Sequence, residues 1–133
     1  MSCANRSLQP AEIDASDICA QCKMAISEKR YAAELADAEG NIMKFDNVDC
    51  MARYAAAHNL QSRATAWWVV DSQGNEWLDL RHATLVRSAS IPGPMGSGVL
   101  AAKDEASAQT IVQRFSGKII HFEDLWKTEQ ERP

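Results

Sequence analysis

The sequence contains no apolar run long enough to cross a membrane and no excess of positive charge. Its most apolar stretch, residues 64–70, is far shorter than the roughly 20 residues that a membrane-spanning helix requires. The formal net charge is −4, and acidic and basic residues are interleaved, so no basic stripe is available to bind nucleic acid phosphates. These absences argue against a transmembrane protein and against a nucleic acid-binding protein.

The first six residues also lack the apolar segment of a secretory signal, and as written the chain could be cytosolic. A second interpretation is that the mature chain begins at Cys3, after removal of a signal sequence. Cys3 is followed by the polar, proline-containing stretch 4–16, which is typical of a tether between a lipidated cysteine and a folded domain. The alternative is an unmodified cysteine in a flexible tail.

The sequence shows no activated serine, no pair of carboxylates arranged for acid–base catalysis and no phosphate-binding loop. Four of its 18 acidic residues gather where helices are predicted to begin, and there they stabilise the helix dipole. These residues are Asp46, Asp49, Asp104 and Glu105. Nothing in the sequence indicates an enzyme.

The first half of the chain predicts a hairpin, a helix and a strand. Strands at 30–35 and 41–45 flank the turn 37–40. Asp46 or Asn47 is expected to cap a helix that ends near residue 58, and its apolar residues follow a spacing of i, i+3, i+4 and i+7. A strongly apolar strand at 65–70 completes the unit.

The second half repeats this order, with strands at 83–88 and 99–102, a helix capped by Asp104 and a last strand at 118–122. The predicted fold is therefore α+β, a tandem pair of ββαβ units whose halves pack on each other, because each is too small to bury both faces of its sheet. Whether they share one sheet stays open. The predicted division is a flexible tether (1–16), a first lobe (17–72), a second lobe (73–127) and a tail (128–133).

The sulfur-containing residues carry the clearest chemical signal. Cys19, Cys22 and Met24 lie within six positions on one predicted loop, and thiolates and thioethers are the soft ligands that favour Cu(I). Met95 stands between Pro94 and Gly96 in a glycine-rich loop, where a core methionine is unusual. Met95 could still plug the core below that loop.

The other candidate metal ligands are weaker. Met43 and Met51 belong to predicted apolar faces, and Cys50 is expected to be a small buried hydrophobe. His121 falls in the last predicted strand and is expected to be a core histidine, with an auxiliary metal-ligand or supporting role as the alternative.

Two rival interpretations of the Cys19–Cys22 pair remain open. A structural zinc site would need Cys50 and His58 as its other ligands, and the resulting spacings are long and irregular. A thiol–disulfide redox module would use Cys19 and Cys22, but such a motif should open a helix directly after a strand, and this one precedes a hairpin.

Six short motifs, in order along residues 17–125, resemble the NosL family. They are Cys22-Lys23-Met24, Lys44-Phe45-Asp46, Trp77-Leu78-Asp79, Pro94-Met95-Gly96, Gly117-Lys118-Ile119-Ile120 and Phe122-Glu123-Asp124. The resemblance implies two ββαβ halves of a treble-clef-like kind, similar to the organomercurial lyase domain. It also implies a periplasmic, lipid-anchored copper chaperone, acting in the maturation of nitrous oxide reductase in denitrification.

The resemblance further implies a Cu(I) site at Cys22, Met24 and Met95, with Cys3 as the lipidated residue. The implied partner is the apoprotein of the copper enzyme or its membrane assembly complex. Two residues depart from the family pattern. Lys23 stands where many members have glycine, and Cys19 is not required by the copper motif, so Cys19 is a candidate auxiliary ligand.

Overall fold

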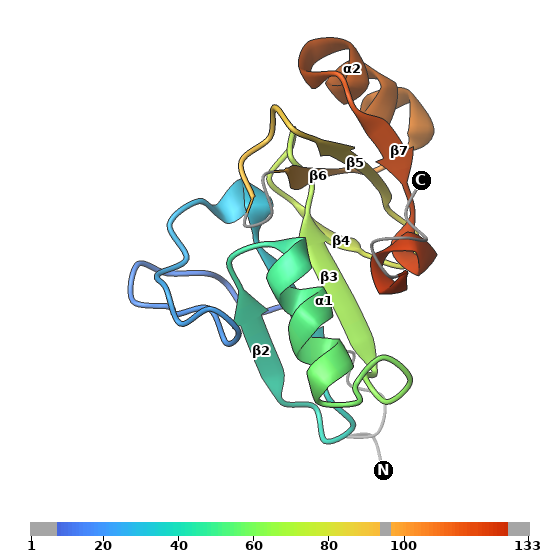
Figure 1. Cartoon of the computed structure of the whole chain (residues 1–133). Helices are drawn as coiled ribbons and strands as arrows, with labels where there is room; N and C mark the ends of the chain where they lie inside the picture. The colour runs from blue at the N-terminus through green and yellow to red at the C-terminus, as the bar shows by residue number, and fades with distance from the viewer. Residues whose placement is uncertain (1–7, 94–96, 128–133) are drawn as a thin grey trace.

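The computed structural model describes residues 8–93 and 97–127, which form two antiparallel sheets and two α-helices (Figure 1). The elements, in order, are η2 (Lys29–Tyr31), β1 (Ala33–Ala36), β2 (Ile42–Phe45), α1 (Val48–Ala57), β3 (Ala66–Val70), β4 (Trp77–Asp79), β5 (Thr84–Ser88), β6 (Gly98–Ala102), α2 (Glu105–Phe115), β7 (Lys118–Ile120) and η3 (Phe122–Trp126). The predicted α+β class is confirmed. Within the described residues, no helix is long and apolar enough to cross a membrane.

The first sheet has the strand order β2-β1-β3-β4, and the second has the order β6-β5-β7. Helix α1 packs across the first sheet, while α2 lies against the second at the other end of the molecule (Figure 1). A single parallel bridge between Asp71 and Ala101 joins the sheets, and Ser72 reinforces it by donating its backbone N–H to the Ala101 carbonyl at 2.9 Å. The halves therefore have separate sheets that meet at one point.

Strands β5 and β6 of the second sheet are buried on both faces, which explains why β6 is an almost continuous apolar run and why two adjacent residues of β5, Leu85 and Val86, are both apolar. In β5, Leu85 belongs to the main core, whereas the next residue, Val86, belongs to a smaller core under α2. In β6, Ala101 belongs to the main core and Leu100 to the smaller core. One face of the second sheet therefore completes the core of the first half.

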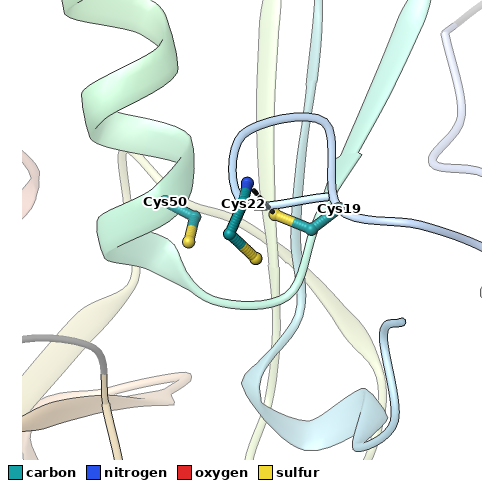
Figure 2. A group of neighbouring side chains, drawn as sticks. All are labelled: Cys19, Cys22 and Cys50. Carbon is teal, nitrogen blue, oxygen red and sulfur yellow. Dashed lines mark hydrogen bonds between the residues drawn. The ribbon is translucent and has the colours of Figure 1, made fainter. Parts of the chain in front are cut away.

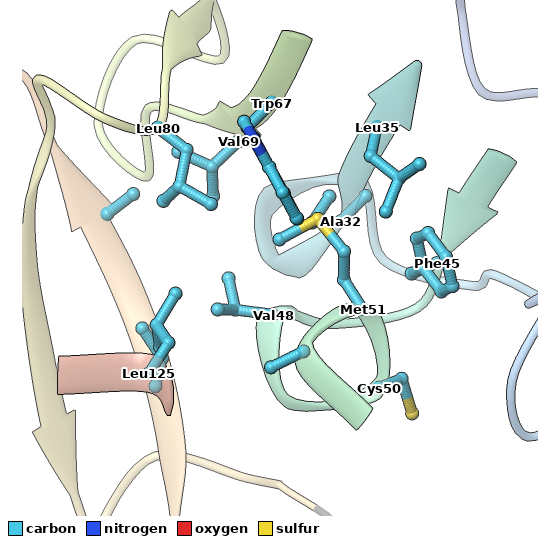
Figure 3. Packing of buried hydrophobic residues seen from close by; sticks show 14 of the residues in the cluster. Ala32, Leu35, Phe45, Val48, Cys50, Met51, Trp67, Val69, Leu80 and Leu125 are labelled. Carbon is cyan, nitrogen blue, oxygen red and sulfur yellow. The ribbon is translucent and has the colours of Figure 1, made fainter. Parts of the chain in front are cut away.

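The main core gathers around α1 (Figure 3). Met51 and Val48 are fully buried and point from the helix toward Trp67, Leu80 and Leu125. Trp67 also makes edge contacts with two rings at the C-terminal end, Phe122 and Trp126, each with its centroid 5.3 Å from the Trp67 ring. Trp67 and Trp126 thus pack the C-terminal end of the chain against the core of the first half.

Three details differ from the sequence predictions. Residues 29–31 form the short helix η2, so β1 begins only at Ala33. The three-residue strand β4 was not predicted, because its run is too short to show alternation. β4 pairs with β3 in the first sheet although it lies within the range 73–127, and the division into lobes at residue 72 stays a prediction.

His121 was predicted to lie in the last strand, and this placement is wrong. β7 ends at Ile120, and His121 is the exposed N-cap of η3. Its side chain accepts the backbone N–H of Asp124, and the Asp124 carboxylate accepts the His121 N–H at 2.9 Å. The apolar residues around His121 therefore continue into a short helix instead of a longer strand.

The stretch 8–16, which the sequence assigns to a flexible tether, is bonded to the first sheet. The backbone N–H of Ala11 donates to the carboxylate of Glu34 at 2.8 Å, and Lys44 Nζ donates to the Glu12 carbonyl at 2.8 Å. Glu34 is completely buried in β1, and its second carboxylate oxygen has no hydrogen-bond partner among the described residues. Residues 1–7, including Cys3, lie outside the described part of the chain.

A buried ion pair joins the two halves. Arg87 in β5 donates both guanidinium nitrogens to Asp49 in the first turn of α1, at 2.8 and 3.0 Å. The Asp49 side chain is 8% exposed and that of Arg87 is 18% exposed. Arg87 also donates to the hydroxyl of Ser97 at 3.4 Å. This two-pronged geometry fixes the start of α1 relative to the second sheet.

Replacing Arg87 with alanine should destabilise the fold strongly, because the Asp49 carboxylate would stay buried without its partner. We expect the free energy of unfolding to fall by roughly 3 kcal/mol, measured by urea denaturation. The matched control is Arg81→Ala, whose partner Asp79 is about half exposed, and it should cost at most about 1 kcal/mol. Equal losses in the two variants would contradict the structural role of the Asp49–Arg87 pair.

Glu34 should make the fold less stable as the pH rises. Burial raises the pKa of Glu34 to about 7. Between its ordinary pKa and 7, the unfolded chain has released this proton while the folded chain still holds it, so stability falls across that interval and is constant above it. The loss should reach about 3 kcal/mol, at roughly 1.4 kcal/mol per pKa unit.

The measurement is the melting temperature between pH 5 and 8. Glu34→Gln should remove the decline, whereas Glu39→Gln, at an exposed position in the hairpin turn, should keep it. A decline of the same size in all three proteins would show that Glu34 is not its source.

Candidate metal centre

The loop that carries Cys19, Cys22 and Met24 is closed on itself by backbone hydrogen bonds. The Cys19 N–H donates to the Met24 carbonyl at 2.8 Å, and the Lys23 N–H donates to the Cys19 carbonyl at 2.9 Å. Ile18 and Ala25 form an antiparallel bridge at its base. The loop is therefore a tight turn, held independently of any bound ion.

Within this turn, Lys23 has a φ of +67°, a left-handed conformation that favours glycine. The reversal at Lys23 turns the chain back after Cys22. The Cys22 N–H then donates to Cys19 Sγ at 3.5 Å, so both thiols lie on the same side of the loop (Figure 2). A glycine would fit this backbone conformation better than the lysine found here.

Cys50 completes a cluster of three thiols. It lies in the first turn of α1, where its N–H donates to the cap residue Asn47 at 2.8 Å. The sulfur atoms of Cys19, Cys22 and Cys50 all lie within 4.8 Å of one another, between the loop and the start of α1 (Figure 2). All three cysteines are free thiols.

Cys50 is buried in the hydrophobic core, as the sequence predicts, and its sulfur also lies close to those of Cys19 and Cys22. Cys50 is buried, with 2% of its surface exposed, but its sulfur turns away from the centre of the hydrophobic cluster (Figure 3). The sequence places Cys50 three residues after the Asn47 cap. It gives no sign that this turn of the helix faces the loop, because the contact depends on how α1 docks.

The donors form a gradient of exposure. Cys19 is fully buried and Cys22 is exposed, while Met24, two residues further, is 66% exposed. Cys22, Met24 and Cys50 share the lining of a cavity of about 510 Å³. Gly93, two residues before Met95, lines the same cavity. Met95 itself lies outside the described residues.

The cluster favours one negative charge at Cys19. A hydrogen bond from the Cys50 thiol, together with backbone N–H groups including that of Cys22, lowers the pKa of Cys19 against the opposing effect of burial. The same hydrogen bond raises the pKa of Cys50, which keeps its proton. Burial, and then the negative charge of Cys19, raises the pKa of the Asp46 carboxyl in the cavity wall. A thiolate favoured at Cys19 is a ligand that a soft cation can bind directly.

The remaining candidates lie elsewhere. His58 is at the opposite end of α1 from Cys50, where it stacks on Tyr54 with ring centroids 4.1 Å apart. His121 caps η3. In the described part of the chain, the three cysteines are the only group of His, Cys, Asp and Glu residues arranged to hold an ion, so a fourth ligand for tetrahedral zinc is absent there.

The gradient of exposure predicts one fast-reacting thiol per chain. In a Cys3→Ser variant, which removes the cysteine outside the described residues, Cys22 should react with a chromogenic disulfide reagent at least tenfold faster than Cys19 and Cys50, because both of those are buried. Adding Cys22→Ser should abolish the fast phase. Three equal rates in the folded protein would contradict the burial of the cluster.

Comparisons with known proteins agree with the family resemblance of the sequence motifs. The NosL family model matches residues 10–129, whereas no curated protein sequence matches the chain. Among solved structures, the chain is similar to the crystal structure of the copper chaperone NosL from Shewanella denitrificans, with a TM-score of 0.80. The two are 18% identical, and the match covers 95% of this chain and 100% of that chain, which shows a shared fold. The family match confirms the resemblance seen in the six sequence motifs: this chain belongs to the NosL family.

Proposed function

We propose that this chain is a Cu(I)-binding metallochaperone, not an enzyme, that delivers copper to a maturing exported copper enzyme. The observation that carries the proposal is a cluster of three thiols within 4.8 Å of one another, two of which, Cys22 and Cys50, line one surface cavity together with the exposed thioether of Met24. Sulfur donors of these two kinds favour Cu(I) over hard cations. Membership of the NosL family, and a shared fold with a solved copper chaperone, support it.

In this proposal Cys22 binds Cu(I) as a thiolate, and Met24 and Met95 contribute thioethers. Cys22 and Met24 line one cavity, and Gly93 brings the chain to the same cavity just before Met95. Cys19 is an auxiliary donor. His121 caps η3 with its side chain, so the geometry offers no support for its auxiliary role.

Such a site suits transfer between proteins. Thioethers are neutral and weakly basic, so a single thiolate offsets the copper charge, and the exposed ion can accept a ligand from a partner before losing its own. Cys22 and Met24 are both exposed, which lets a partner approach from that side. A closed cage of four protein ligands would hinder this exchange.

The acceptor and the location are proposed from the family resemblance. We infer that copper goes to nitrous oxide reductase or its membrane assembly complex, in the periplasm of a denitrifying cell. A lipid on Cys3 would hold the chaperone at a membrane. The stretch 8–16 is bonded along the first sheet, so the segment available as a free tether is shorter than residues 1–16.

The two rival functions, a structural zinc site and a thiol redox module, fit the geometry less well. Structural zinc would lack a fourth protein ligand in the described part of the chain. A thioredoxin-like redox site would place a reactive thiolate at the exposed cysteine that opens a helix, whereas here the thiolate is favoured at the buried Cys19, in a turn.

The test is an anaerobic titration of the reduced protein with Cu(I) against a chromophoric competitor, alongside Zn(II). We expect tight binding of Cu(I) that zinc does not displace. Met24→Leu and Met95→Leu keep the side-chain volume and remove the sulfur. Each is made together with Cys19→Ala and Cys50→Ala, so that no other thiol near Cys22 holds the ion, and each should weaken binding about tenfold or more relative to that background. Cys22→Ser should abolish tight binding.

The matched control is Met43→Leu, the same exchange at a methionine in β2 that does not line the cavity. In the same background, it should bind Cu(I) as tightly as the background itself. The copper-chaperone proposal fails if zinc binds more tightly than Cu(I), or if Met24→Leu and Met95→Leu bind Cu(I) as tightly as Met43→Leu does.

A further inference from the structure

We propose that Cys19, Cys22 and Cys50 form a second, inner position for Cu(I), and that Cys22 is shared between it and the exposed position that Cys22 forms with Met24. This inference rests on the proposed copper-handling function and extends it to two cysteines outside the family's Cys-x-Met motif. Copper would be held at the inner position and released through the outer one.

The spacing of the three sulfur atoms fits an ion between them. A metal–sulfur bond of about 2.3 Å in a planar three-coordinate site requires sulfur atoms about 4.0 Å apart. In the apo protein all three sulfurs already lie within 4.8 Å of one another. Closing around an ion therefore needs side-chain shifts of less than about 1 Å by this comparison.

The donor set also selects the ion. Three thiolates without a fourth protein ligand, as in the described part of the chain, suit a soft, low-coordinate cation better than zinc, which in structural sites takes four ligands. The pocket around the inner sulfurs is largely closed, because Cys19 and Cys50 are 0% and 2% exposed. Water and small competing ligands can reach copper there from the cavity that Cys22, Met24 and Cys50 line.

The fold supplies positive potential for the extra negative charge of this position. Cys50 lies in the first turn of α1, where the helix dipole is positive, and the Cys22 N–H points at Cys19 Sγ. The one acidic residue in that first turn is Asp49, and Arg87 neutralises it. The Asp49–Arg87 pair thus removes a charge that would repel thiolates at the start of α1.

Movement between the positions is a ligand exchange at constant oxidation state. From the outer position inward, every bond from Cu(I) to a thioether breaks, that to Met24 included, and bonds to the Cys19 and Cys50 sulfurs form. The Cys22–copper bond is kept throughout, and the Cys50 thiol releases its proton to solvent. The reverse exchange presents copper beside Met24, which is 66% exposed, where a partner's ligand can take it.

The experiment compares Cys19→Ala, Cys50→Ala and the double variant with the wild type, all carrying Cys3→Ser and one equivalent of Cu(I). Copper-edge X-ray absorption and the ultraviolet copper–thiolate band report how many thiolates bind the ion. We expect three in the wild type and one in the double variant. Copper should pass to a chelator at least tenfold faster from the double variant.

Met51→Leu is the control for packing, since Met51 is a fully buried neighbour of Cys50 in α1 and is not a donor in the proposal. It should keep the three-thiolate spectrum and the slow release. Circular dichroism checks that each variant is folded. If a cysteine variant does not fold, the count of thiolates in the wild type decides, because the outer position alone gives only one.

The inner position is overturned if the wild type shows one bound thiolate, or if the folded double variant keeps the wild-type spectrum and release rate. In either case, loss of tight binding in Cys22→Ser would leave the chaperone proposal intact. If no protein in the series binds Cu(I) tightly, the proposed function itself fails.

Discussion

One backbone hydrogen bond sets the position of the cysteine loop. The Ala20 N–H donates to the Lys44 carbonyl at 2.9 Å, and Lys44 lies in β2, the strand at the edge of the first sheet. An edge strand has backbone groups that no neighbouring strand uses, and here the loop takes one of them. Only two residues, Asp46 and Asn47, separate β2 from α1, so the same strand also fixes where the helix begins. β2 therefore fixes the positions of both the cysteine loop and the start of α1. This shared support brings the three sulfur atoms together.

The secondary structure followed from the sequence where local signals were strong. Asn47 and Asp104 act as caps, and each accepts the N–H of the residue three positions later at 2.8 Å. The apolar spacing of both helices placed their buried faces correctly. The failures came where a segment was too short to show a period, as in β4, or where an apolar run continued into a different element, as after Ile120.

The candidate site was only partly predictable, for a physical reason. Cys19, Cys22 and Met24 are near in sequence, so their shared loop could be read directly. Cys50 reaches them only through the docking of α1 on the first sheet, which depends on side chains such as Met51 and Trp67 packing in three dimensions. The sequence also could not show whether Cys50 is a metal ligand, because a buried thiol ligand and a small hydrophobe give the same sequence pattern. The direction in which the sulfur points distinguishes them, and that requires the fold.

The second half of the molecule contains a helix start that resembles the start of α1 but has no cysteine. In α2, Ser107 stands three residues after the cap Asp104, as Cys50 stands three residues after Asn47 in α1. The local backbone is alike in both places, and a hydroxyl oxygen, a hard donor with little affinity for soft ions, takes the place of the sulfur. The same helix-start geometry thus occurs twice in one chain, once with a sulfur and once with a hydroxyl oxygen at the third position after the cap. What sets the two helix starts apart is this single atom and the cysteine loop that lies opposite it in the first half.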